Sequence, residues 1–424
     1  MTTNATAAAP PRTRSRVRQL AAASAGNAIE WYDWYAYSFL ATTFGPLIFP
    51  SKSDIASTLG AFAVFAVGFF MRPIGGLLLG AIADRHGRRF ALTATILLMG
   101  LGSLLVGITP TFASAGILAP IMLVVGRLIS GLSIGGEFAA STTFLVESAP
   151  PNRRGLFASF QYVSTAIGQL CASGLAALLV TVLSKEAMTS WGWRVPFLLG
   201  TVVTLFALWL RRGIDETHDV SEKNRPKLFD AIRHYPKQSL LVCGITLGGT
   251  IAYYAWTTYL PTYAQQSAGF SKSEALTVST ISLAFFGLIQ PLGGMISDRI
   301  GRKPMLLVFA GGFVVLIVPL LRLIGDAFWS LLAVSLAGMA LLTCYTSIAA
   351  AVNAETIPAR VRASGIGFPY SVTVAAFGGT APYLGTWLAS KGHGGLFPLY
   401  VAMLCAISFV VYFLMPERSK EPLR

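Results

Sequence analysis

Apolar stretches about as long as a lipid bilayer is thick recur along the whole chain. A helix that crosses a membrane needs roughly 20 residues, and the 424 residues contain twelve such stretches. Their ranges are about 20–46, 57–81, 90–110, 117–144, 155–182, 193–211, 238–262, 273–296, 304–324, 327–351, 364–389 and 396–415. This pattern predicts an all-α membrane protein with twelve transmembrane helices.

Composition and charge agree with a membrane protein. Charged residues make up 12% of the chain, whereas soluble domains contain about 25%. The formal net charge of +14 would suit a nucleic-acid partner, but its distribution favours another explanation. If the N-terminus is cytoplasmic and the spans alternate, 24 of the 32 Lys and Arg residues lie in cytoplasmic segments. This positive-inside bias predicts a multi-pass protein with both termini in the cytoplasm and no nucleic-acid partner.

Signals of enzymatic or ATP-driven chemistry are missing from the sequence. The four cysteines lie far apart within apolar spans and show no metal or redox spacing. No phosphate-binding G-x-x-x-x-G-K-[ST] loop occurs, and the four histidines lie in predicted loops rather than beside a buried nucleophile. We therefore expect neither an enzyme nor a protein with a cofactor or a metal ion.

Two strings of the first half recur in the second. "GAIADRHGRR" at 80–89 corresponds to "GMISDRIGRK" at 294–303, and each follows the second span of its half. "ESAPPNRRG" at 147–155 corresponds to "ETIPARVRASG" at 355–365, after the fourth span. Internal repetition of this kind is typical of secondary transporters, whose site lies near the bilayer midplane between the repeats.

The longest polar stretch divides the chain between the sixth and seventh spans. It carries charges of both signs from Arg211 to Lys237. We predict a six-helix bundle at 1–212, a cytoplasmic linker at 213–237 and a second six-helix bundle at 238–424.

These motifs carry a family resemblance. The duplicated pattern G-x-x-x-D-R-x-G-R-[RK] resembles the signature of the major facilitator superfamily. Within it, "GNAIEWYDWYAY", "GFFMRPIGG", "GLSIGGEFAAS" and "GLFASFQYVS" resemble the metabolite:proton symporter family. "ASFQYVSTAIGQL", "WGWRVPF", "LWLRRGIDET" and "YTSI" are most similar to the α-ketoglutarate permeases of bacteria. The resemblance implies a major facilitator fold in the bacterial inner membrane, with two halves related by pseudo-two-fold symmetry that work by alternating access.

Three acidic residues lie well inside predicted spans: Glu30 and Asp33 in the first, and Glu137 in the fourth. An ionised side chain at that depth costs at least about 2.5–3.5 kcal/mol, so an intramembrane acid is a candidate functional residue. Glu30 and Asp33 are three apart and should share a helix face, where mutual repulsion and burial favour proton uptake. We predict that one of the three acids carries a coupling proton; alternatively, an acid pairs structurally with a buried arginine.

Arginines inside spans supply the opposite charge. Arg72 lies twelve residues before Asp84, which places it about 18 Å from the cytoplasmic loop at 1.5 Å per residue. Arg127 and Arg194 lie toward the periplasmic ends of their spans. Because a guanidinium binds a carboxylate through a planar fork, all three are candidate substrate ligands; the resemblance implies this for Arg72 and Arg194 in particular. The alternative is a structural ion pair with one of the acids.

The second half has no acid in mid-span and offers neutral polar groups instead. Tyr253, Tyr254 and Tyr345 are the candidates for completing a substrate cavity. Aromatic residues in membrane helices also serve as packing residues and interface anchors, which is the alternative for each.

The duplicated loop motif predicts a gate. Asp84 and Asp298, with Arg88 and Arg302, can form ion pairs or face the positive end of a neighbouring helix. Such contacts would close the cytoplasmic side in one conformation and break in the other. The alternative is that these arginines only set the membrane topology.

Taken together, these features predict a proton-coupled symporter that imports a small carboxylate, best represented by a dicarboxylate such as α-ketoglutarate. Its ligands would be an organic acid and H⁺, and we expect a monomer in the lipid bilayer. Alternatives are symport of citrate, shikimate or another organic acid, or of an osmolyte such as proline or betaine. The resemblance disfavours the osmolyte, because such members tend to carry a long charged C-terminal extension. A non-transporting sensor and an intramembrane enzyme are further alternatives.

Overall fold

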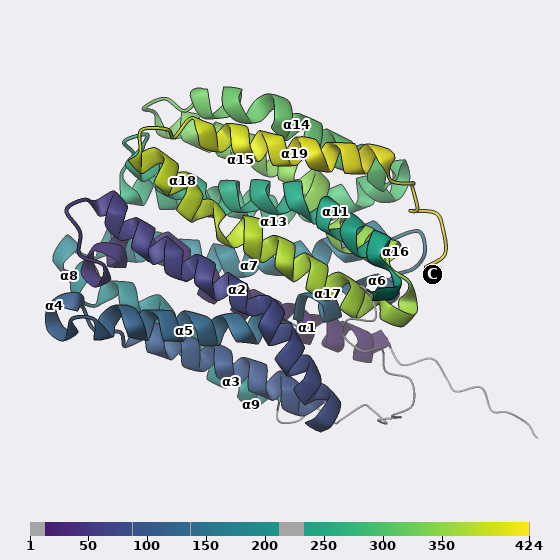
Figure 1. Cartoon of the computed structure of the whole chain (residues 1–424), viewed down its shortest axis with the longest axis horizontal. Helices are drawn as coiled ribbons and strands as arrows, with labels where there is room; N and C mark the ends of the chain where they lie inside the picture. The colour runs from purple at the N-terminus through teal and green to yellow at the C-terminus, as the bar shows by residue number, and fades with distance from the viewer. Residues whose placement is uncertain (1–12, 87, 136, 212–232, 424) are drawn as a thin grey trace, which may run out of the picture.

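The computed structural model describes residues 13–86, 88–135, 137–211 and 233–423, and these residues form helices and no strands. Twelve long helical segments, some broken into two or three pieces, run side by side (Figure 1), and each coincides with one predicted apolar stretch. Seven of the described helices are long and apolar enough to cross a membrane, and shorter apolar helices accompany them. The prediction of a twelve-helix membrane protein is therefore confirmed.

The first half is built from α1 to α9. Its elements are α1 (Thr13–Ile48), α2 (Asp54–His86), α3 (Arg88–Gly107), α4 (Phe112–Ala115), α5 (Leu118–Ile134), α6 (Glu137–Glu147), α7 (Arg154–Val182), α8 (Lys185–Ser190), η1 (Gly192–Arg194) and α9 (Val195–Arg211). The predicted linker lies outside the described residues as far as position 232.

The second half begins at Pro236. Its elements are α11 (Pro236–Tyr254), η3 (Ala255–Tyr259), α12 (Leu260–Gln266), α13 (Lys272–Ile300), α14 (Arg302–Arg322), α15 (Phe328–Thr346), α16 (Ala349–Thr356), η4 (Ala359–Val361), α17 (Arg362–Thr373), η5 (Val374–Gly379), α18 (Ala381–Ser390) and α19 (Leu396–Leu414). The segments η3 and η5 are π-helical turns in mid-span, a distortion that is frequent at functional sites.

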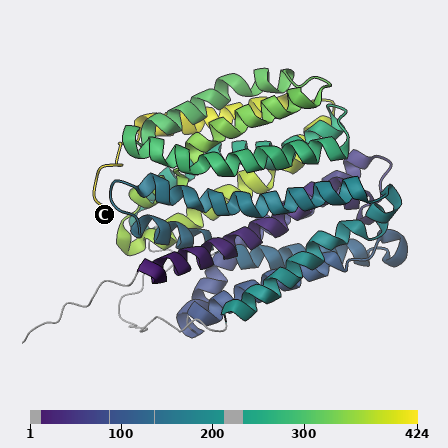
Figure 2. The same ribbon diagram turned by 180° about the vertical axis from the view of Figure 1, so that it is seen from behind.

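The two halves lie against each other along α7 and α13, and α1 packs along α7 (Figures 1 and 2). The start of α1 and the C-terminus lie at the same end of the bundle, which we call the terminal end. The short helices α4 and α8 lie at the other end, which we call the opposite end. Residues that face the α7–α13 interface can therefore contact side chains of the other half.

Glycine contacts set how closely α2 and α5 approach each other. A Cβ atom on Gly131 would lie 2.1 Å from the carbonyl oxygen of Gly68, and one on Gly135 would lie 2.0 Å from that of Arg72. Any larger residue would push α5 away from α2. These two glycines therefore fix the position of the Arg72 backbone within the first half.

A similar contact joins α1 to α7. A Cβ atom on Gly168 would lie 2.1 Å from the carbonyl oxygen of Ala28. One turn away, the Asn27 side chain donates hydrogen bonds to the hydroxyls of Ser164 (2.8 Å) and Thr165 (3.0 Å). The depth and rotation of α1 are therefore set by α7.

We predict that Gly168→Ala destabilises the protein while Gly174→Ala on the same helix does not. Overpacking against a backbone typically costs about 1–3 kcal/mol, whereas a Cβ on Gly174 would meet its nearest atom, Thr280 Cγ2, at 3.8 Å. The measurement is the unfolding temperature in detergent. Equal unfolding temperatures for the two variants would show that α1 does not depend on this contact.

Candidate functional site: a buried guanidinium between the two halves

Arg72 lies on α2 of the first half and is 4% exposed. Its guanidinium carbon lies 3.9 Å from the ring centre of Phe69, 5.1 Å from that of Trp34 and 5.4 Å from that of Trp31. Trp31 and Trp34 are three apart on α1, so both indoles face α2. Aromatic faces attract a cation, with a gain of about 2 kcal/mol or more when it is desolvated, and they hold the guanidinium in place.

The hydrogen-bonding capacity of Arg72 is only partly used. Its Nε and Nη2 atoms are buried and have no hydrogen-bond partner among the described residues. The Tyr254 hydroxyl from α11 of the second half also has none, and its ring packs 5.3 Å from that of Phe69. The guanidinium thus faces the second half with donors that remain available to a ligand.

Tyr370 of α17 brings a second polar group from the second half to this region. It lies within electrostatic range of both Arg72 and Glu30, and its ring stacks on that of Phe138 from α6 at 3.8 Å. Glu30 is 5% exposed. Arg72, Glu30 and Tyr370 therefore share one neighbourhood that spans both halves.

Asp33 lies in a different environment from Glu30. Its Oδ2 atom is 2.9 Å from Arg127 Nη1, and both side chains are almost fully buried. Ser103 donates a hydrogen bond to the other carboxylate oxygen. The spacing predicted that Glu30 and Asp33 would act together, whereas the structure places Asp33 in an ion pair among α1, α3 and α5 inside the first half. That arrangement matches the structural alternative for Asp33 and Arg127.

The other predicted binding residues occupy varied positions. Arg194 lies near the opposite end, where its guanidinium donates to the carbonyls of Ser190 and Thr109 (3.1 Å for the latter). Tyr253 accepts a hydrogen bond from Gln169 Nε2 of the first half at 2.5 Å. Tyr345 packs against Gly249 of α11, and its hydroxyl has no partner among the described residues. The side chain of Glu137 lies outside those described.

The terminal end is closed by a helix-capping contact between the halves. Asp298, at the end of α13, accepts hydrogen bonds from the backbone N–H groups of Gly155 (2.7 Å) and Leu156 (2.9 Å) at the start of α7. The positive end of the helix dipole favours a carboxylate there. A Cβ on Gly155 would lie 2.6 Å from the Gly294 carbonyl, so the two helices nearly touch.

Ion pairs surround this contact. Arg302 donates to Asp298 (2.9 Å). It also donates to both carboxylate oxygens of Glu355, and the shorter of these bonds joins Arg302 Nη2 to Glu355 Oε1 at 3.1 Å. Across the interface, Arg154 of the first half lies 3.8 Å from Glu355 of the second, and Arg362 of the second half pairs with Glu147 of the first. The side chains of Asp84 and Arg88 lie outside those described.

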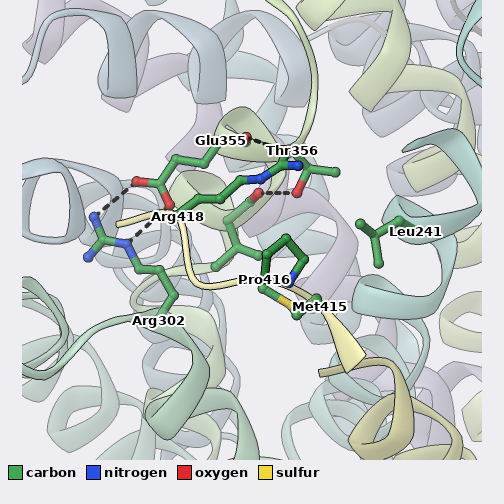
Figure 3. A pocket seen from close by; sticks show the side chains of 8 residues that line it. Leu241, Arg302, Glu355, Thr356, Met415, Pro416 and Arg418 are labelled. Carbon is green, nitrogen blue, oxygen red and sulfur yellow. Dashed lines mark hydrogen bonds and ion pairs between the residues drawn. The ribbon is translucent and has the colours of Figure 1, made fainter. Parts of the chain in front are cut away.

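The C-terminal segment covers the same ion pairs. Arg418 donates to the carbonyl of Glu355, beside the Arg302 fork (Figure 3), and Arg154 donates to the carbonyl of Glu421 at 2.7 Å. Burial opposes ionisation of Glu417, but the backbone N–H groups of Lys303 and Ser419 donate to its carboxylate and lower its pKa. The hydrogen bonds to the Glu417 carboxylate therefore contribute their full stability above the ordinary pKa of glutamate. That stability is lost as the pH falls through the lowered pKa.

Comparisons with known proteins agree with this architecture. The model of the family described as Major Facilitator Superfamily matches residues 26–368 and again 268–424. The chain belongs to the Major Facilitator Superfamily.

Among its relatives, the alpha-ketoglutarate permease of Escherichia coli K12 is 39% identical over 96% of this chain and 95% of that protein. A putative proline/betaine transporter of Staphylococcus aureus is 33% identical over 93% of this chain and 87% of that protein. The solved structure of the proton:xylose symporter XylE matches with a TM-score of 0.77 at 17% identity, over 97% of this chain and 98% of that one. These relatives are transporters, so this facilitator is not an enzyme.

Several residues of the site carry no obvious sequence signal. In the sequence, Trp31, Trp34 and Phe69 look like ordinary packing residues. Their position over Arg72 depends on how the helices are rotated, which the sequence does not give. The repeated strings did contain Glu147, Arg154, Glu355 and Arg362, but their repetition does not state that each glutamate faces the arginine of the other half. A symmetry argument from the repeated strings could have predicted this cross-pairing of glutamates and arginines between the halves.

We predict that Asp298→Ala accelerates hydrogen exchange at the start of α7 in this facilitator. Hydrogen bonds to charged groups contribute about 1.5–3 kcal/mol each, so the Gly155 and Leu156 amides should exchange roughly 10- to 100-fold faster. Mass spectrometry of peptides covering 154–160 measures this, and Asp326→Ala, at an exposed site, is the matched control. Unchanged exchange in the Asp298 variant would mean that the contact does not hold the terminal end closed.

Proposed function

We propose that the protein is a proton-coupled symporter that imports a small carboxylate, best represented by a dicarboxylate such as α-ketoglutarate, by alternating access. It would lie in the bacterial inner membrane with both termini in the cytoplasm, so that the terminal end is the cytoplasmic side. The observation that carries this proposal is the buried Arg72 guanidinium, two of whose nitrogens have no partner among the described residues.

A carboxylate is the ligand that suits Arg72 best. The guanidinium is planar and permanently charged, and it presents parallel N–H groups that match a carboxylate. The Tyr254 hydroxyl interacts with Arg72 and would add a further donor to a ligand bound there. The 39% identity to an alpha-ketoglutarate permease supports the same class of substrate.

The osmolytes are the second candidate, because proline/betaine transporters are also relatives and aromatic cages bind quaternary ammonium groups. In this structure the Phe69, Trp34 and Trp31 rings already lie over Arg72. The same faces are therefore occupied by the protein's own cation. Citrate and shikimate carry carboxylates and fit the Arg72 argument as well as α-ketoglutarate does.

Glu30 is the acid that we propose as the proton carrier. Asp33 is neutralised by Arg127 at 2.9 Å, so protonating it would leave a buried charge without its counter-ion. Glu30 shares the neighbourhood of Arg72, because both residues act electrostatically on Tyr370. A proton on Glu30 removes a negative charge from the neighbourhood that receives the anionic substrate, which links the two binding events.

We assign gating to Asp298 and Arg302, and by repetition of the motif to Asp84 and Arg88. The support is that Asp298 and Arg302 lie in the contacts that join the halves at the terminal end. Opening that end requires these contacts to separate. The hydrogen-exchange measurement on Asp298→Ala also tests this assignment.

We predict that Arg72→Gln abolishes uptake of the organic acid at ordinary concentrations. Removing one partner of a buried charged contact costs about 2–5 kcal/mol, so the KM should rise at least about 30-fold, and Arg72→Lys should give an intermediate value. Proteoliposomes under an imposed pH gradient are compared for α-ketoglutarate, succinate, citrate, shikimate and betaine. Arg322→Gln, at an exposed site, is the matched control, and accumulation of betaine alone would refute the proposal.

We further predict that Glu30→Gln retains exchange of substrate across the bilayer but loses uphill accumulation, because a neutral amide cannot release a proton. The accumulation ratio under a pH gradient should fall to about one. Asp33→Asn should instead lower stability by about 3–5 kcal/mol, because it leaves Arg127 unpaired, and Arg127→Gln in the same chain should restore part of it. Normal accumulation by both single variants would exclude the first helix as the proton site.

A further inference from the structure

After α19 ends at Leu414, the chain crosses the terminal end as a non-helical segment, residues 416–423, which we call the strap. The strap leaves the second half and reaches the first, where Arg154 donates to the Glu421 carbonyl at 2.7 Å. A turn in which the Glu421 N–H donates to the Arg418 carbonyl at 3.0 Å gives the strap its shape. The strap is therefore a connection between the halves that is separate from the ion pairs.

Glu417 anchors the strap to the start of α14 in the second half. Its Oε2 atom accepts the backbone N–H of Lys303 at 2.8 Å, which is the bond that an N-cap side chain normally makes. The N-cap residue itself is Gly301, and the first turn of α14 contains no acidic residue, so Glu417 supplies the carboxylate that this helix end favours. A Cβ atom on Gly301 would lie 2.8 Å from the same oxygen, so the glycine leaves the space that the anchor occupies.

Between its anchor and its far end the strap is held more loosely. Arg418 donates to the Glu355 carbonyl at 3.5 Å, a small pocket lies beside Pro416 and Arg418 (Figure 3), and several strap residues are exposed. At the far end, Leu423 packs against the main hydrophobic core. The strap can therefore detach without the unfolding of any helix.

The contact with Arg154 connects the strap to the closure of the terminal end. Arg154 is the first residue of α7, the helix whose next two N–H groups bind Asp298. When the halves separate at this end, Arg154 moves with α7 while the Glu417 anchor stays with α14. The strap must then release one of them.

We propose that the strap is a lock on the terminal end, anchored by Glu417 and closed by its contact with Arg154. The lock acts on the conformation and not on the solute, so it goes beyond the proposed function and holds for any transported substrate. It adds to the Asp298 contact a second device that has to open before the terminal end can open.

The test is hydrogen exchange of the full-length protein in lipid nanodiscs without substrate. In Glu417→Ala, peptides covering 416–423 should exchange about 10- to 100-fold faster, because bonds to a charged group are lost. Peptides covering 154–160 should exchange about 3- to 10-fold faster, because Arg154 then loses its contact with the strap. Glu417→Gln, which keeps an acceptor oxygen without the charge, should give intermediate values. Lys420→Ala, at an exposed position of the same strap, is the matched control and should leave both peptides unchanged.

Three results would overturn the inference. Faster exchange at 416–423 with no change at 154–160 would show that the strap is tied to the second half alone and does not hold the first. No change at either peptide would show that Glu417 is not the anchor. Equal acceleration in peptides covering 260–266 at the opposite end would show a general loss of stability. Because no substrate is present, each of these results is independent of whether the protein carries α-ketoglutarate.

Discussion

A permanently charged guanidinium buried in a membrane bundle is the constraint on which the rest of the site depends. Placing Arg72 there costs at least about 2.5–3.5 kcal/mol, and three aromatic rings offset part of that cost. Two of the guanidinium nitrogens nevertheless have no hydrogen-bond partner among the described residues. An anion that binds there removes a penalty that the empty site carries. Its binding energy is thus available to change the relative stability of the carrier's conformations.

The contacts at the terminal end follow the internal repeat. Glu147 and Arg154 of the first half occupy the repeat positions of Glu355 and Arg362 in the second. The structure pairs each glutamate with the arginine of the other half. Each ion pair therefore bridges the halves and must break if they separate. Asp298 adds hydrogen bonds to the start of α7, so the closed state combines Coulombic attraction with directional contacts.

Much of this could be predicted from the sequence, because span length and loop charge are local properties. The twelve helices followed from apolar runs, and Arg72 and Asp84 lie on one helix, as their spacing predicted. The partners of the acids could not be predicted, since they depend on helix rotation and on contacts between distant segments. Asp33 and Arg127 are 94 positions apart, and nothing in their local spacing indicates the pair. The i, i+3 argument predicted a common environment for Glu30 and Asp33, whereas packing among α1, α3 and α5 gives Asp33 a partner of its own.

The two ends of the bundle are closed by different chemistry. At the opposite end, contacts between the halves include Thr42 with Gln265 (3.0 Å) and Thr58 with Gln266 (3.1 Å), with Lys272 donating to the Thr42 carbonyl. The two Thr–Gln hydrogen bonds are neutral and contribute about 0.5–1.5 kcal/mol each, less than bonds to charged groups, and Lys272 is the one charged donor among these three contacts. The charged terminal end is therefore the more firmly closed of the two. A carrier built this way would separate more readily at the opposite end. Under the proposed function, the energy released when an anion neutralises Arg72 would help to separate the ion pairs at the terminal end.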